Sequence, residues 1–507
     1  MNGLTERYAD RIAGVIECPD RVVIMGTLPT ACYADGMSRF LTARKVRIFD
    51  YFEFTKPLKD DIHENAKRIA IQAGLEIEFI RKLKSFRKEQ RIQEILAERG
   101  NHPGLVHVFS AMETCSSYKP WHDKTAHRTY LKPDGGRCLH YYFYFIDEEL
   151  GLCYLRVPTW CPFRLQFYFN GHNWLARQLD QRGIGYHMLD NAFLDIDDWD
   201  EAQRLADAFD VRKLHRRLDK YVARFCPVAK TFGESYHWSL MQTEYATDIV
   251  FRSAHDLKPV YEEITRTAVS TVKADKVATF LGRKLHGNYQ HEMGTHFHTR
   301  IEGTCIRHEM AGKAAIKMYD KFGRILRIET TVNDVSFFRH YRKVEHRDGT
   351  SSMKQAPVQK TIYSLPVLTE LCRAANRRYL NFISTLSDPS NGLQKMRKIA
   401  SPARDAGRSY RGFNVMAAED YELFLAIVRG EHNISGLTNR TLRRALPHKT
   451  SSQISRQLKR LRTHGLIKKV GRTYKYYLTK LGQLAVTAAL KVRDAIVIPT
   501  LAQPATC

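Results

Sequence analysis

The chain has 507 residues, of which 43% are hydrophobic, 11% aromatic and 26% charged, so the composition excludes a wholly disordered protein. No apolar run reaches the roughly 18 residues of a membrane-spanning helix, and the charged N-terminal segment contains no signal-peptide core. We therefore expect a cytoplasmic protein with no membrane partner, whose ten cysteines are mostly free thiols. The 80 Lys and Arg residues exceed the 54 Asp and Glu residues by 26, and this excess favours polyanionic partners such as nucleic acid.

The sequence predicts a basic N-terminal lobe of mixed structure over residues 1–103. Residues 21–25, RVVIM, are typical of a short strand. Residues 60–99 are predicted to form two or three basic helices, because apolar residues recur with helical spacing between Ile69 and Ile80.

Residues 104–345 are predicted to form a β-rich body in two halves. In the first half, β-forming runs at 139–146, 152–157 and 163–169 have short connections, which indicates an antiparallel meander. A helix capped by Asn170 or Asn173, an extended segment at 185–196 and helical residues 198–225 follow. The second half centres on strands at 299–307, 314–321 and 325–332. The predicted fold class is therefore α+β and multi-domain, with a central antiparallel β-rich body and flanking helices.

Residues 346–414 read as a linker that contains one helix. The stretches 346–360 and 387–414 are polar and lack periodicity, and the second is rich in Ser, Pro, Gly and basic residues. A helix is expected over 365–386, between these two stretches.

The C-terminal residues 415–495 give the strongest pattern. From His432 to Arg493 there are 15 Lys or Arg residues and no Asp or Glu. A charge block of this length is often disordered, but apolar spacing predicts helices near 421–427, 439–446 and 451–463. A hairpin over 466–478 and a closing helix over 481–492 complete the order of a winged helix-turn-helix.

Residues 451–482, SSQISRQLKRLRTHGLIKKVGRTYKYYLTKLG, resemble MarR-like winged-helix domains, which share the pattern SxxxSRxLKxLxxxGLI and a wing followed by LTxxG. The resemblance implies binding to double-stranded DNA and a homodimer. Gln453 and Arg456 are of the types that read base edges, and the short Ser455 lies on the same helix. Basic side chains suited to phosphate or to the minor groove are Lys459, Arg460, Arg472 and Lys475. A solvated basic face, a protein-contact wing and double-stranded RNA are the alternatives.

Two strands of the body place charges side by side. Alternation puts Lys317, Tyr319 and Lys321 on one face of the first strand. Arg327 and Glu329 share a face of the next. Such a face suits a phosphate, or a metal ion with a phosphate, and the alternative is a solvent-facing sheet with cross-strand ion pairs.

These two strands, with a YDK run at 319–321 and an LRIE run at 326–329, resemble replication initiators of filamentous phages and rolling-circle plasmids. The family's upstream acidic strand matches the segment around Asp190. The resemblance implies a nuclease that nicks DNA with a tyrosine and a divalent metal such as Mg²⁺. The matching positions are Asp190, Tyr319, Asp320, Lys321 and Glu329.

In this interpretation Asp190 and Glu329 are metal ligands and Tyr319 is the candidate nucleophile, although the chain has 25 tyrosines to choose from. Lys321 and Arg327 would stabilise charge on the phosphate, and Arg327 would thereby contact nucleic acid.

Three smaller clusters contain residue types that suit metal binding or base stacking. His296 and His298 flank one residue on a strand and can share a metal, as in HUH nucleases, or they are exposed loop histidines; His291 and Glu292 lie close by. Zinc-type ligands recur with spacings that fit no zinc finger at His107, Cys115, His122, His127, Cys138 and His140. The aromatic run 141–145 fits either base stacking or core packing.

The leading hypothesis is a nucleic-acid-binding protein of a mobile element or replicon. It would bind double-stranded DNA through the winged helix and nick or process a strand with the body. The alternatives are a non-enzymatic DNA-binding regulator, and a ribonucleoprotein component in which the basic helices and the aromatic sheet hold structured RNA; single-stranded DNA is a further possible partner for the body.

Overall fold

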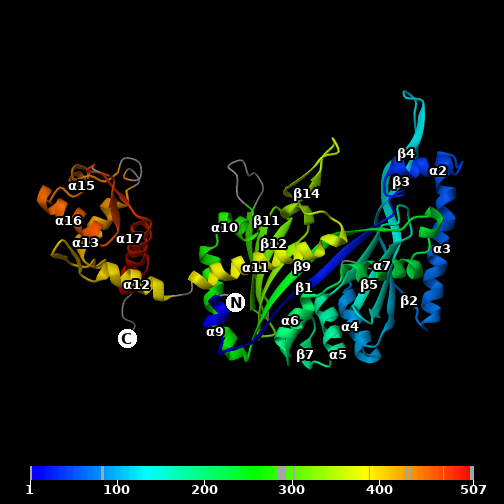
Figure 1. The fold of residues 1–507 in the computed structure, drawn as a ribbon, viewed down its shortest axis with the longest axis horizontal. Helices are drawn as coiled ribbons and strands as arrows, with labels where there is room; N and C mark the ends of the chain where they lie inside the picture. Colours follow the sequence, from blue (N-terminus) through cyan, green and yellow to red (C-terminus); the bar gives the residue numbers. More distant parts are fainter. Residues whose placement is uncertain are drawn as a thin grey trace. The chain divides into compact units, whose positions relative to one another are not determined.

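The computed structural model describes residues 3–81, 85–283, 293–300, 303–386, 389–429, 432, 436–471 and 473–502. The chain forms two compact units, residues 1–387 and 388–507, and each is described by itself (Figure 1). The fold is α+β, with a large β-sheet and flanking helices in the first unit and a winged helix in the second.

An eleven-stranded sheet forms the first unit, in the order β10-β11-β12-β13-β9-β1-β6-β5-β4-β3-β2. Neighbouring strands are antiparallel except β2 and β3, which are parallel. The strands are β1 (Ile12–Thr27), β2 (Ile77–Ile80), β3 (Gly104–Asp123), β4 (Arg128–Asp147), β5 (Gly151–Pro158), β6 (Leu165–Phe169), β9 (His237–Phe251), β10 (Met293–Arg300), β11 (Gly303–Met310), β12 (Ala314–Lys321) and β13 (Ile325–Val332). Two hairpins lie outside this sheet, β7 (Tyr186–Leu189) with β8 (Ala192–Ile196) and β14 (Arg339–Glu345) with β15 (Ser351–Pro357).

Helices surround the sheet of the first unit. They are α1 (Gly3–Arg7), α2 (Ala34–Ala43), α3 (Tyr51–Gln72), α4 (Lys88–Arg99), α5 (Gly171–Arg182), α6 (Trp199–Asp207), α7 (Val211–Phe225), α8 (Ala229–Phe232), α9 (Ala254–Thr271), α10 (Ala274–Phe280) and α11 (Leu365–Leu386). Helix α11 lies across β9 and β13 (Figure 1). Among the described residues, no helix combines the length and apolar character that crossing a membrane requires.

Strand β1 joins the two halves of the sheet. It pairs with β6 on one side and β9 on the other, and most of its 16 residues are buried because it lies between these two neighbours. The structure therefore divides the chain differently from the four predicted parts. Residues 1–103 supply β1 and β2 to the sheet instead of a separate lobe, and α11, predicted within a linker, packs in the core of the first unit.

The predicted meander forms as β4, β5 and β6, and Asn170 caps α5 by accepting hydrogen bonds from the backbone N–H groups of His172 and Asn173. Of the two or three helices predicted over 60–99, two form as α3 and α4, and the part of the prediction that covers 77–80 is wrong because these residues form β2. Helix α3 ends before Gly74, whose φ of 68° suits glycine, and the chain then pairs with β3.

The aromatic side chains of the run 141–145 in β4 pack in two hydrophobic cores. Tyr141, Phe143 and Phe145 belong to the main core, and the Phe143 ring stacks on Phe225 of α7 at 4.7 Å. Tyr142 and Tyr144 point to the opposite face and belong to a smaller core. All five are at most 5% exposed, so the run offers no open platform for bases.

The second unit contains the predicted winged helix. Its elements are α12 (Pro389–Ala400), β16 (Ala403–Asp405), β17 (Arg408–Tyr410), α13 (Ala418–Ile427), α15 (Asn439–Ala445), α16 (Ser451–Thr463), β18 (Ile467–Lys469), β19 (Tyr476–Leu478), α17 (Lys480–Val492) and α18 (Ile498–Ala502). Thr450 caps α16 in a capping box with Gln453. The apolar stripe of α16, Ile454, Leu458 and Leu461, is buried in this unit's own core, as its spacing predicts.

A close approach between α5 and β1 gives the first prediction. A Cβ atom on Gly171 would lie 2.0 Å from the backbone oxygen of Pro19. We expect Gly171→Ala to lower the free energy of unfolding by about 1–3 kcal/mol, because the backbones must separate. The control is Gly3→Ala, whose Cβ would meet nothing within 4 Å. Urea unfolding of the full chain, followed by circular dichroism, measures both, and equal stability of the two variants would contradict this packing.

Candidate functional site

The register of the central strands places polar side chains on one face of the sheet. Lys317 of β12 lies opposite Glu329 of β13, and Tyr319 lies opposite Arg327. On the next strand, β9, Asp248 lies opposite Arg327. The alternation that the sequence predicts for β12 and β13 is therefore present, and the face extends onto β9 and β1.

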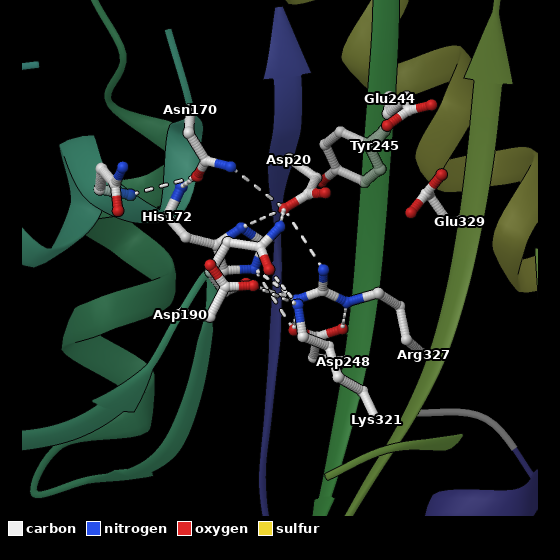
Figure 2. A network of polar contacts seen from close by, with 12 residues as sticks. Asp20, Asn170, His172, Asp190, Glu244, Tyr245, Asp248, Lys321, Arg327 and Glu329 are labelled. Atoms are coloured by element: carbon white, nitrogen blue, oxygen red, sulfur yellow. Dashed lines mark hydrogen bonds and ion pairs between the residues drawn. The ribbon is translucent and has the colours of Figure 1, made fainter. Parts of the chain in front are cut away.

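A buried ion network lies at the centre of this face (Figure 2). The guanidinium of Arg327 is 0% exposed and donates two hydrogen bonds of 2.6 Å to the carboxylate of Asp248. Its Nη1 lies 3.3 Å from Asp20 Oδ1. His172, at the start of α5, lies between the same carboxylates, with Nδ1 2.9 Å from Asp20 and Nε2 3.3 Å from Asp248.

Electrostatics within this network shift the pKa values of its groups. Burial disfavours the charged carboxylate of Asp20, but Arg327 and His172 hold the pKa of Asp20 well below its ordinary value. Burial also disfavours the imidazolium of His172, but Cys18 and the Asp20 and Asp248 carboxylates raise the pKa of His172 well above its ordinary value. Arg327 therefore faces two carboxylates inside the protein, and its Nη2 also lies 3.2 Å from Nε2 of His172.

Asp20 is held by one of its two oxygens. Its contacts with the described residues all use Oδ1: Asn170 and Asn191 donate to it at 3.4 and 2.7 Å, and Arg327 and His172 complete the set. Asp20 sits at a β-bulge of β1, between Pro19 and Arg21. The arrangement fixes the carboxylate while leaving Oδ2 available to a further cation.

Three carboxylates meet beside this network. Asp20, Glu244 of β9 and Glu329 of β13 each offer an oxygen within 4.8 Å of the other two. Glu329 is 2% exposed, and it accepts hydrogen bonds from Lys317 at 2.6 Å and from the Tyr319 hydroxyl at 2.9 Å. We call Asp20, Glu244 and Glu329 the carboxylate cluster.

The carboxylate cluster is short of positive charge. Lys317 is shared between Glu329 and Glu244, whose Oε1 lies 3.1 Å from the ammonium. Burial and the neighbouring Glu329 raise the pKa of Glu244. Burial opposes the charge on Lys317, but Glu329 and Glu244 raise the pKa of Lys317. Since hard divalent cations such as Mg²⁺ prefer carboxylate oxygens, the donor set fits such an ion.

The structure brings Glu329 together with Asp20 and Glu244, and not with Asp190. Asp190 lies on the exposed turn between β7 and β8, with φ of 52°, and its carboxylate is 3.5 Å from Lys321. Figure 2 shows Asp190 and Glu329 on opposite sides of the network. Lys321 also donates a hydrogen bond to Asn191, so it holds the turn between β7 and β8 in place. Burial and the neighbouring Arg327 lower the pKa of Lys321. Asp320 belongs to the same strand but not to the carboxylate cluster.

Arg327 requires a correction. The sequence placed it against nucleic acid, but its side chain is enclosed by Asp248, Asp20 and the backbone oxygen of Asn191. A buried cation that is fully engaged by carboxylates has no surface to offer a phosphate, so its role is to position the carboxylate cluster.

The histidine pair gains no support from the described part of the chain. His296 lies on β10 opposite Arg307, and it belongs to no cluster of three metal-ligating groups among the described residues. The side chain of His298 lies outside the described residues, as do His291 and Glu292.

The basic residues of the winged helix differ in burial. Arg460 is 4% exposed, and its guanidinium donates to Asp420 at 2.6 and 2.9 Å and to the backbone oxygens of Arg411 and Gly412. Its assignment as a phosphate contact is therefore corrected: it ties α16 to α13. By contrast, Arg456 and Lys475 are exposed. Arg472 lies outside the described residues.

Other predicted contacts of α16 have partners within the unit. Lys459 and Arg462 both face Asp405, at the end of β16, and the hydrogen bond from Lys459 lowers the pKa of Asp405. Gln453 accepts from the backbone N–H of Thr450, and the Ser455 hydroxyl accepts from Asn439. Lys459 is half-buried and the other three are exposed, and each needs to give up or share a partner before it contacts a ligand.

No protein-family model, curated protein or solved structure matches this chain.

The buried network gives the second prediction. Asp248→Asn removes the charge that Arg327 faces and leaves the shape nearly unchanged. We expect the free energy of unfolding to fall by about 3–5 kcal/mol, because a buried cation loses its main partner. Asp190→Asn is the control, since its exposed ion pair with Lys321 contributes at most about 1 kcal/mol. Denaturant unfolding compares the two, and a small effect of Asp248→Asn would contradict the network.

Proposed function

We propose that this chain is a DNA-binding protein of a mobile element or replicon, which docks on double-stranded DNA through its winged helix and cleaves a strand at the carboxylate cluster of the sheet. The observation that carries the proposal is the cluster itself. Three carboxylates converge on one point, and a tyrosine hydroxyl is bound to one of them at 2.9 Å.

A divalent cation held by Asp20, Glu244 and Glu329 would polarise a phosphodiester and neutralise charge on its oxygens. The chain's own residues perform the other tasks. Lys317 lies beside the same carboxylates and can stabilise negative charge on the phosphate, which an ammonium does as a point charge. Arg327 and His172 keep Asp20 ionised and oriented.

Tyr319 is the oxygen nucleophile in this proposal. Burial and Glu329 raise the pKa of Tyr319 well above its ordinary value, so the phenol is protonated and needs a base. Glu329 accepts its hydrogen bond and is placed to take the proton. Attack on phosphorus would form a bond between phosphorus and the tyrosine oxygen and break one bridging P–O bond. The departing oxygen would take up a proton.

An exposed cation lies beside the carboxylate cluster on the same face of the sheet. Arg21 of β1 is exposed and lies opposite Glu244 in register, and its guanidinium lies 5.5 Å from the ring of Tyr168 on β6. The Tyr168 ring stacks on Tyr154, which is buried in the smaller core, so these rings support Arg21 and are no open platform for bases. The exposed charge of Arg21 favours contact with the phosphate backbone of a strand.

The winged helix supports duplex binding through its exposed cations. Arg456 lies on α16 and Lys475 beside β19. Further exposed cations of this unit are Arg440, Arg443, Arg444, Lys468, Lys469 and Lys480. Cations that lack buried partners are available to phosphates, and their binding releases counterions.

The third prediction concerns the winged helix. Arg456→Ala is expected to weaken duplex binding by about 1–3 kcal/mol if Arg456 reads a base, and Lys475→Ala is expected to lower the salt dependence by about one unit of slope. Lys354→Ala, an exposed lysine of β15 in the other unit, removes the same charge as a control. Fluorescence anisotropy at several salt concentrations measures binding. Unchanged binding in both winged-helix variants would remove this domain from the proposal.

The fourth prediction concerns catalysis. With Mg²⁺ or Mn²⁺ present, the full chain should nick supercoiled plasmid DNA, and Glu329→Gln should reduce the rate at least about 100-fold by removing a ligand and base. Asp190→Asn should retain activity, because Asp190 lies apart from the carboxylate cluster.

Tyr319→Phe separates two mechanisms within the same assay. Loss of a covalent protein–DNA adduct in this variant supports the tyrosine nucleophile. Full nicking by Tyr319→Phe would assign the attack to water. Binding without nicking by the unaltered protein would contradict catalysis and favour a DNA-binding regulator.

A further inference from the structure

A second group of metal-type ligands lies on the same sheet, away from the carboxylate cluster. Cys115 of β3, Cys138 and His140 of β4 each offer a ligand atom within 4.8 Å of the other two. Cys138 and His140 are 2% and 1% exposed, while Cys115 is partly exposed. The three side chains share one face, because residues 138 and 140 alternate to the same side and Cys115 pairs next to them.

The separation of two of these ligands suits a tetrahedral ion. The sulfur of Cys138 lies 3.7 Å from Nδ1 of His140. Zinc bonds of about 2.3 Å to sulfur and about 2.0 Å to nitrogen, at a tetrahedral angle, put these two atoms roughly 3.6 Å apart. Nδ1 also lies 3.1 Å from the backbone oxygen of Cys138, to which it can only donate, so binding an ion through Nδ1 would replace this hydrogen bond and move the ring proton to Nε2.

The cluster faces a small cavity. A cavity of about 160 Å³ is lined in part by Cys115, His140, Met25 and Met241. Zinc sites with three protein ligands keep a fourth position for water or another ligand. The cavity, which Arg156 and Arg164 also line, supplies space for a water or an anion at that fourth position.

The position in the fold gives such an ion a structural effect. The pairing between β4 and β5 ends at His140 and Pro158, and beyond this point β3 and β4 pair only with each other in the sheet. Figure 1 shows this hairpin extending away from the other strands. An ion bound to Cys115, Cys138 and His140 would clip the two strands at the base of the projection.

We propose that Cys115, Cys138 and His140 form a binding site for a thiophilic divalent cation of the zinc class, with its fourth position open to the cavity. The site is independent of the carboxylate cluster, which carries only oxygen ligands. Thiolate and imidazole ligands select zinc, whereas carboxylates suit magnesium. Failure of one site therefore leaves the other untouched.

Metal content of the full chain, purified under reducing conditions, gives the fifth prediction. One Zn²⁺ per chain should bind and resist excess Mg²⁺. Replacement by Co²⁺ should give the thiolate charge-transfer and tetrahedral ligand-field absorption of a cysteine-bound ion. Cys115→Ser, at the partly exposed ligand, should lose the stoichiometric metal and these bands. Cys32→Ser, a partly exposed cysteine outside the cluster, and Glu329→Gln, in the carboxylate cluster, should keep both.

Hydrogen exchange supplies a second readout that does not depend on absorption. Removal of zinc by a chelator should speed amide exchange in β3 and β4 around the cluster, and Cys115→Ser should show the fast rate with or without zinc. Absence of bound zinc, retention of the cobalt bands in Cys115→Ser, or a Cys115–Cys138 disulfide in the reduced preparation would each overturn the proposal.

Discussion

The guanidinium of Arg327 has no access to solvent, and strands of the first unit supply the carboxylates that balance its charge. The guanidinium is bound by Asp248 on β9, by Asp20 on β1 and by the backbone of Asn191. An unpaired charge of this kind costs several kcal/mol, so the strands and the hairpin that supply these partners are fixed relative to one another. The same contacts use Oδ1 of Asp20, and in this way the ion network fixes the position of Asp20 beside Glu244 and Glu329.

The sequence predicts local structure well where the signal is local. The meander, the Asn170 cap and the helices and wing of the second unit follow from alternation, helical spacing and capping residues. The central place of β1 could not be predicted, because its partners β6 and β9 lie more than a hundred residues away in the chain. Strand order in a large antiparallel sheet is a long-range property, and composition carries no record of it.

The candidate site was predictable only in part, for the same reason. Lys317, Tyr319 and Glu329 lie on adjacent strands, so alternation alone brings them together. Asp20 and Glu244 reach Glu329 through the order β13-β9-β1. The available signal was an acidic residue close to an apolar run in a predicted strand, which is costly to bury unless it has a partner. That signal marks Asp20 and Glu244 as residues that need a partner, but it does not identify the partner.

Basic residues of this chain have different roles according to their burial. Arg327 and Arg460 are enclosed by carboxylates and hold elements together, whereas Arg456 and Arg21 are exposed and have charge to offer a ligand. Net charge and position on a helix do not distinguish these cases. Asp420 shows why: it lies 40 residues from Arg460 and binds it.

The central claim of this account is that the carboxylate cluster binds a divalent cation. Anomalous diffraction from a crystal soaked in Mn²⁺ tests it most directly. The account predicts a peak bonded to Asp20, Glu244 and Glu329, whereas a site that holds only Lys317 at saturating Mn²⁺ would contradict it.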